Sequence, residues 1–154
     1  MRIATANAFD AGIDDYVVKP FNPRVLMARI KGGHRVFLHS RRGVPPALTD
    51  AGGIACANGH DVAQKSDVII TMVPDTPHVE DVLFGDNGVA QGLSKGKIVV
   101  DMSSISPIET KEFAKRINAL GCEYIDAPVS GGEVGAKAAS LTIMAGGTDA
   151  AFAK

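Results

Sequence analysis

The feature that most constrains the fold of this chain is an alternation of short apolar runs with segments of helical spacing. Two of the runs, residues 68–70 (Val-Ile-Ile) and 98–100 (Ile-Val-Val), are apolar at every position. Strands of this kind are typical of a mainly parallel sheet that helices cover on both faces. The sequence therefore predicts an α/β fold with a doubly wound, Rossmann-like sheet.

The same alternation gives the order of the elements along the chain. We expect strands at residues 16–19, 35–39, 53–56, 67–73, 97–102, 123–127 and 141–145. In a doubly wound sheet the first six take the spatial order 3-2-1-4-5-6, with the seventh at the edge.

Two helices are bracketed by their own start and stop residues. Ser106 is placed to cap the helix that starts at Pro107, Glu109 follows three residues after the serine, and Gly121 ends the helix. A second helix, residues 24–31, follows an Asn-Pro pair and is closed by two glycines. Because no linker or repeat interrupts the pattern, we expect one domain over residues 1–154.

Composition limits the partners. Sixteen basic and seventeen acidic residues give a net charge of -1, so we expect neither nucleic acid nor an anionic membrane as a partner. Cys56 and Cys122 lie far apart in sequence, in no metal-binding or redox spacing. We therefore expect a reduced, cytoplasmic protein without a metal site.

Four segments carry specific motifs: residues 34–41 (HRVFLHSR), 67–74 (DVIITMVP), 101–107 (DMSSISP) and 126–132 (DAPVSGG). In this order they resemble the β-hydroxyacid dehydrogenases, the family of 3-hydroxyisobutyrate dehydrogenase and tartronate semialdehyde reductase. The resemblance covers residues 33–154. It implies the nucleotide-binding domain of an enzyme that reduces a small oxo-acid with a nicotinamide cofactor.

The resemblance also implies roles for individual residues. Val73 and Pro74 would lie against the cofactor, and Ser104 would approach the nicotinamide. Ser130, Gly131 and Gly132 look like the loop that holds the substrate carboxylate, and two glycines with one hydroxyl make a plausible anion cradle. The residues alone favour an ordinary turn, and it is the resemblance that favours the carboxylate loop.

The end of the second strand bears on the choice of cofactor. An NAD site typically has an acidic side chain there, which binds the ribose hydroxyls, but this chain has Ser40, Arg41 and Arg42. Arginines suit a 2′-phosphate, so NADP is favoured if a dinucleotide binds. The alternative is that the arginines belong to a solvated turn.

The N-terminal segment departs from the family, because the chain contains no Gly-x-Gly-x-x-Gly motif. Residues 2–31, with the run DYVVKPF at 15–21, instead resemble the C-terminal part of a response-regulator receiver domain. In receivers the Lys-Pro bond is often cis, so the bond between Lys19 and Pro20 is expected to be cis, or else trans in an ordinary turn. Phosphorelay is not expected, since the acceptor aspartate belongs to receiver strands that have no counterpart here. Lys19, Asn22 and Arg24 form a candidate site for a lone phosphate or sulfate.

A second departure concerns catalysis. The family's catalytic lysine and its helical second domain correspond to sequence beyond Lys154, so no catalytic residue is assigned. We therefore expect an engineered or recombined chimera, with residues 1–32 derived from a receiver and 33–154 from a dehydrogenase, that folds without evolved activity. No cofactor is expected, or NADP only weakly. The alternatives are a residual NADP-binding module and a receiver-like interaction module. Self-association is expected through the face that a second domain would cover.

Overall fold

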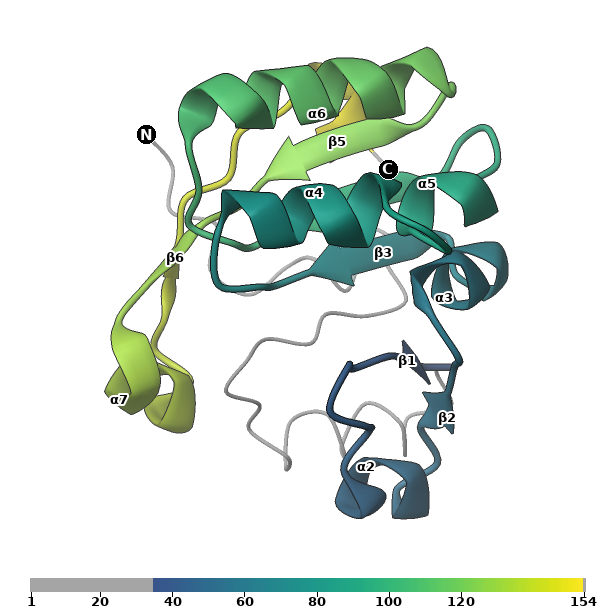
Figure 1. The fold of residues 1–154 in the computed structure, drawn as a ribbon. Helices are drawn as coiled ribbons and strands as arrows, with labels where there is room; N and C mark the ends of the chain where they lie inside the picture. Colours follow the sequence, from purple (N-terminus) through teal and green to yellow (C-terminus); the bar gives the residue numbers. More distant parts are fainter. Residues whose placement is uncertain (1–34, 154) are drawn as a thin grey trace.

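A computed structural model describes residues 35–153 of the chain as a parallel α/β structure (Figure 1). The strands are β1 (Phe37–Leu38), β2 (Ile54–Ala55), β3 (Val68–Thr71), β4 (Ile98–Asp101), β5 (Glu123–Asp126), β6 (Val129–Ser130) and β7 (Thr142–Ile143). The helices are α2 (Pro46–Asp50), α3 (Gly59–Lys65), α4 (Thr76–Phe84), α5 (Val89–Gly92), α6 (Pro107–Ala119), α7 (Gly132–Ala138) and α8 (Asp149–Phe152). Each strand predicted within this range is present, and all of them are shorter than expected.

Two parallel strand groups reproduce the predicted order. β1 pairs with β2, and β3, β4 and β5 form a three-stranded parallel sheet with β4 in the centre. In the predicted numbering these are strands 3-2 and 4-5-6. The strand that the prediction puts between them, residues 16–19, lies outside the described residues, as does the helix predicted at 24–31.

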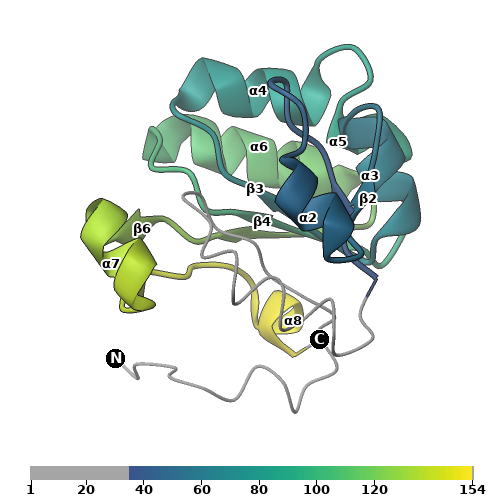
Figure 2. The same ribbon diagram turned by 90° about the horizontal axis from the view of Figure 1, so that it is seen from below.

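Helices α3 to α6 cover one face of the three-stranded sheet. Figure 2 shows α4 and α6 on one side of β3 and β4, with α8 on the other side. The core on the α4–α6 side is built from aliphatic and aromatic side chains of helices and strands alike: Ala63, Ile69, Val79, Leu83, Val89, Val99, Phe113, Ile117, Cys122 and Tyr124. All four residues of β4 are buried, as predicted for a central parallel strand, whereas β3 alternates between half-buried and buried positions.

The opposite face carries a second apolar cluster. Its buried members are Ile98, Val100, Met102 and Ala127, which lie on β4 and just beyond the ends of β4 and β5. A third, small cluster joins β1 to α2 through Val36, Leu38 and Leu48. Within residues 35–153, no helix is both long and apolar enough to cross a membrane.

The bounds of α6 follow the local sequence, but its start is stabilised differently from the prediction. The helix begins at Pro107 and is followed by Gly121, which takes the left-handed φ of +75°. The Ser106 side chain makes no capping hydrogen bond. Instead, the Ser106 carbonyl accepts hydrogen bonds from the amide and the hydroxyl of Thr110, both at 3.0 Å. The predicted side-chain cap is therefore wrong, and the proline and backbone contacts fix the helix start.

The last predicted strand, residues 141–145, is β7, and it does not join the main sheet as a parallel strand. β7 pairs antiparallel with β6, and Gly146 makes a single antiparallel bridge to Asp126 at the end of β5. A parallel connection needs a crossover of about a dozen residues or more. Between β6 and β7 the chain has only the short helix α7 and its flanking turns, so it folds back as a hairpin-like arm (Figure 1).

The C-terminal end of α3 is bound to the sheet by Lys97. Its Nζ donates to the carbonyls of Ala63 at 2.5 Å and Gln64 at 3.1 Å, where the helix leaves carbonyl groups without partners. We expect Lys97→Met to lower the free energy of unfolding by about 1 kcal/mol, because the substitution keeps the aliphatic stem and removes only the charged donor. Urea denaturation followed by circular dichroism measures this. Lys95→Met, at an exposed position nearby, serves as the control and should change little.

Candidate functional site

The carboxyl ends of the parallel strands gather most of the predicted site residues at one edge of the sheet. Thr71, Asp101 and Asp126 are the last residues of β3, β4 and β5, and they stand in direct register. Open α/β sheets bind ligands outside the carboxyl ends of their strands. The loops that follow these three residues are therefore the candidate site.

The loops after β3 and β4 are joined by a hydrogen bond. The Val73 amide donates to Ser103 Oγ at 3.0 Å, and Ser103 is only 2% exposed. Pro74 and Ser104, the neighbours of these two residues, are exposed. The structure thus brings the predicted cofactor residues Val73, Pro74 and Ser104 onto two adjacent loops.

The helices that follow these loops also start close together. The Asp75 carboxylate accepts the Thr76 amide at 2.7 Å at the start of α4. Thr76 Oγ1 in turn accepts the Ser106 amide at 3.2 Å, just before α6 begins. The two loops are therefore tied to each other at both of their ends.

Beneath the two loops lies a buried carboxylate that the sequence analysis did not single out. Asp101 is 0% exposed and accepts hydrogen bonds from Thr71 Oγ1 at 2.9 Å, the Ser103 amide at 3.1 Å and Tyr124 Oη at 3.1 Å. Burial, and then the Asp101 carboxylate, raise the pKa of Tyr124 well above its ordinary value. Burial and Asp101 likewise raise the pKa of Asp126. The sequence signals for this group were the place of Asp101 at the end of a fully apolar strand and at the start of the motif DMSSISP.

The turn after β1 carries the predicted arginines. The Gly43 amide donates to the Ser40 carbonyl at 2.9 Å, and Gly43 takes a φ of +84°, which closes the turn. Arg41 and Arg42 are both exposed on it. Arg41 forms an ion pair of 3.8 Å with Asp81 of α4, and both side chains are 63% exposed. A pair this exposed contributes little to stability, so the guanidinium is free to exchange partners.

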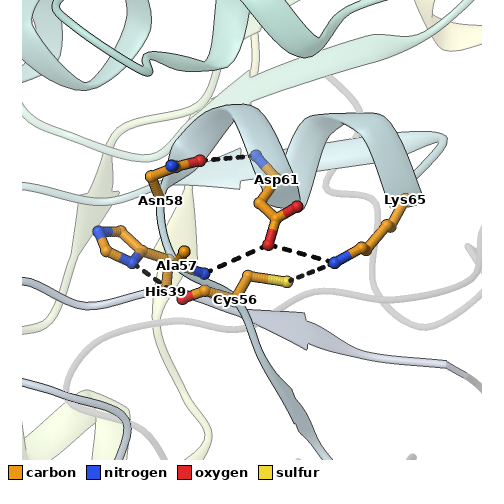
Figure 3. Close-up of polar contacts among 6 residues, drawn as sticks. All are labelled: His39, Cys56, Ala57, Asn58, Asp61 and Lys65. Carbon is orange, nitrogen blue, oxygen red and sulfur yellow. Dashed lines mark hydrogen bonds and ion pairs between the residues drawn. The ribbon is translucent and has the colours of Figure 1, made fainter.

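A second contact anchors that turn to the neighbouring strand. Figure 3 shows His39 Nδ1 against the Cys56 carbonyl, 3.3 Å away, which joins the residues just after β1 and β2. Next to it, Asn58 caps α3 by accepting the Asp61 amide, and Asp61 pairs with Lys65 at 3.2 Å. The Lys65 and backbone contacts lower the pKa of Asp61, whereas burial raises the pKa of the Cys56 thiol.

The predicted carboxylate loop lies on the arm that follows β5. Ser130 is in β6, Gly131 precedes α7 with a φ of +128°, and Gly132 starts α7 with a φ of +55°. A side chain at Gly131 would also approach Leu141, so the tight turn needs glycine there. All three residues are exposed where β6 meets α7, at the end of the arm away from β5.

The remaining predicted positions lie outside the described range. Lys19, Asn22 and Arg24, the candidate anion site, fall within residues 1–34, as does the bond between Lys19 and Pro20. Within residues 35–153, no cluster of three or more histidine, cysteine or acidic side chains is arranged to hold a metal ion.

Comparison with known proteins identifies the family. Residues 25–154 match the family model described as the NAD binding domain of 6-phosphogluconate dehydrogenase. The chain belongs to this family of NAD-binding domains. The match begins inside the segment that was assigned to a receiver fragment, so residues 25–32 are part of the dehydrogenase-like region.

The relatives of this NAD-binding domain are β-hydroxyacid dehydrogenases. The chain is 50% identical over 122 residues to 2-hydroxy-3-oxopropionate reductase of Escherichia coli and 40% identical over 104 residues to human mitochondrial 3-hydroxyisobutyrate dehydrogenase. These alignments cover 79% and 68% of the chain. The chain spans 42% of the length of the first relative and 31% of the second.

Solved structures give the same result for the fold. The structure of 3-hydroxyisobutyrate dehydrogenase from Salmonella typhimurium is 32% identical, with a TM-score of 0.71 over 84% of this chain and 45% of that one. A complex of Psf3 with NADP+ and 2-OPP is 25% identical, with a TM-score of 0.73 over 83% of this chain and 46% of that one. The predicted Rossmann-like fold is confirmed.

These relationships overturn the expectation of a chimeric scaffold without evolved activity. The relatives are named dehydrogenases and reductases, and the family match runs through residues 25–154 of the NAD-binding domain. The expectation gave too much weight to one missing glycine-rich turn. Half of the residues over a 122-residue alignment are identical to those of one enzyme. Identity over that length is stronger evidence for the family than the absence of one turn is against it. The receiver-like residues 2–24 lie outside both the described range and the family match.

Proposed function

We propose that this chain is the NADP(H)-binding domain of an oxidoreductase that interconverts a small hydroxy acid and its oxo-acid. The relatives at 50% and 40% identity are named for 2-hydroxy-3-oxopropionate and 3-hydroxyisobutyrate, and both names denote small hydroxylated acids. The domain would hold the cofactor at the carboxyl edge of β1, β3 and β4. When bound there, the cofactor supplies or accepts a hydride.

The observation that carries the choice of NADP(H) is the exposed arginine pair after β1. Arg41 and Arg42 stand where an NAD site would have a carboxylate for the ribose hydroxyls. Two guanidinium groups instead offer planar donors that match a 2′-phosphate. The exposed ion pair between Arg41 and Asp81 costs little to break, so the Arg41 side chain can turn to the phosphate.

The opposite end of the cofactor would lie against the loops after β3 and β4. Val73 is half-buried and Pro74 is exposed beside it, which gives an apolar edge suited to a flat nicotinamide ring. Ser104 offers an exposed hydroxyl on the neighbouring loop. We assign Val73 and Pro74 to packing against the ring and Ser104 to hydrogen bonding at it.

The substrate carboxylate would be held by Ser130, Gly131 and Gly132. The positive φ angles of both glycines produce a tight turn next to the Ser130 hydroxyl, and such turns expose backbone amides to an anion. No residue of the described range 35–153 is assigned a proton-transfer role.

Affinity for the cofactor should be lower than that of a domain with a glycine-rich turn. The chain has no Gly-x-Gly-x-x-Gly motif, whose glycines let the backbone approach the diphosphate closely. We expect this to forfeit several kcal/mol of binding energy. A lone phosphate or sulfate near Lys19, Asn22 and Arg24 is a separate proposal, which phosphate titration of the same chain tests.

The proposal is tested by titrating the chain with NADPH and with NADH and following the fluorescence of the reduced nicotinamide. NADPH should bind more tightly than NADH. Arg41→Ala and Arg42→Ala should each weaken NADPH binding by about tenfold or more, since each removes a charge-assisted contact to the phosphate, and should leave NADH binding nearly unchanged.

Arg35→Ala is the matched control, because it removes the same charge at the other end of β1. If Arg35→Ala and Arg41→Ala lower NADPH affinity equally, the effect comes from net charge and not from contact with the 2′-phosphate. No response of the wild-type chain to millimolar NADPH would refute the proposed function.

A further inference from the structure

The buried carboxylate of Asp101 connects three strands at the edge that carries the proposed cofactor site. Its Oδ1 accepts from Thr71 Oγ1 at the end of β3 and from the Ser103 amide, and its Oδ2 accepts from Tyr124 Oη on β5. The side chain is 0% exposed. All three donors are neutral, so within residues 35–153 the carboxylate is satisfied by hydrogen bonds from uncharged groups.

A group of this kind is costly to bury. A carboxylate loses its hydration on burial, and apolar side chains of similar volume often hold strands together at least as well. The core on this side of the sheet is apolar, with Ile69 and Val99 on the strands and Leu83 on α4. General stability of the sheet therefore gives no reason for an aspartate at this position.

The contacts continue from Asp101 to the proposed cofactor loops. The carboxylate accepts the Ser103 amide and so fixes the backbone at the start of the loop after β4. Ser103 Oγ then accepts the Val73 amide at 3.0 Å, which sets the loop after β3. These two buried contacts therefore fix the backbone next to the exposed residues Ser104 and Pro74.

We infer that Asp101 is a positioning residue, whose carboxylate sets the backbone of the loops at 73–74 and 103–104 for the nicotinamide end of the cofactor. The inference deepens the proposed function and rests on it for the identity of the ligand. Asp101 is buried beneath the loops and acts through the Ser103 amide and hydroxyl.

The test compares variants that remove different contacts of the same group. Asp101→Leu removes the acceptor of the Ser103 amide and keeps an apolar side chain of similar size. Asp101→Asn keeps an oxygen for that amide and can donate to the Tyr124 oxygen. Tyr124→Phe and Thr71→Val each remove one other hydrogen bond to Asp101 and leave the Ser103 contact in place.

We expect Asp101→Leu to weaken NADPH binding by about tenfold. The Ser103 amide loses its acceptor, so the backbone of the loops after β3 and β4 is no longer fixed. Asp101→Asn should restore affinity to within about threefold of wild type. Tyr124→Phe and Thr71→Val should lower the melting temperature and leave NADPH affinity unchanged. Affinity that instead follows the melting temperature across all four variants would show a purely structural role and overturn the inference.

Amide hydrogen exchange measured by NMR provides a readout that needs no ligand. The amides of Ser103 and Val73 should be protected in the wild type and in Tyr124→Phe, and both should lose protection in Asp101→Leu. Unchanged protection in Asp101→Leu would refute the positioning role. If the wild type does not bind NADPH, the proposed function fails, and the exchange data still decide whether Asp101 sets these loops.

Ser103→Ala covers the case in which Asp101→Leu does not fold. This variant removes only the acceptor of the Val73 amide. It should lose protection at Val73 and weaken NADPH binding in the same direction. Full affinity with full protection at Val73 would overturn the inference.

Discussion

Truncating Leu83 to alanine is expected to lower the free energy of unfolding by about 3–4 kcal/mol, within the range of buried leucine truncations. Leu83 lies on the sheet-facing side of α4 and is 0% exposed. It belongs to the core between the sheet and the helices, together with Val79, Phe113 and Ile117. Its removal leaves a cavity between two helices, which the closely packed neighbours can fill only in part.

Urea denaturation followed by circular dichroism measures this loss. Leu120→Ala is the matched control, because Leu120 lies at the C-terminus of α6 and is 47% exposed. It should cost no more than about 1 kcal/mol. A Leu83→Ala variant as stable as Leu120→Ala would mean that α4 is not packed on the sheet as described.

Gly92→Ala is expected to destabilise the chain by about 3 kcal/mol through overpacking. A methyl group at Gly92 would lie 2.2 Å from the His60 carbonyl oxygen and 3.0 Å from Ala63 Cβ, where α3 crosses α5. The carbonyl belongs to the helix backbone, so the two helices must move apart. The gain in helix propensity from glycine to alanine, about 1 kcal/mol, offsets only part of the cost.

Gly146→Ala is the control for the glycine substitution. Its added methyl group would meet no atom within 4 Å, and Gly146 is not among the glycines with a positive φ. Its effect should stay within about 0.5 kcal/mol. Thermal unfolding of both variants under the same conditions makes the comparison, and equal melting temperatures would contradict the close approach of α3 and α5.

The function could be predicted from the sequence only in part, because two signals conflicted. The motifs at 67–74 and 101–107 predicted a dehydrogenase domain, whereas the absent glycine-rich turn predicted an inert chimera. The prediction drawn from the missing turn, an inert chimera, is wrong. Motifs at the ends of several strands reflect a whole binding edge, while a single turn affects one part of the cofactor's contacts.

Local sequence determined the strands and the bounds of α6. Uninterrupted apolar runs specify buried strands, proline fixes the backbone of a first helical turn, and Gly121 adopts the left-handed conformation at little cost. These effects act over a few residues and need no knowledge of what packs nearby. The short β6–β7 hairpin was missed because the direction of strand pairing depends on the length of the connection.

Only the tertiary structure decided how the candidate site is held together. Asp101 meets Thr71 and Tyr124, which are 30 and 23 residues away in sequence, and Ser103 meets Val73 across 30 residues. No periodicity or motif reports which buried donor reaches which acceptor, since that follows from the register of three strands. The sequence by itself determined which segments become strands and which residues stand at their ends, and the register of the folded sheet decided which of those residues touch.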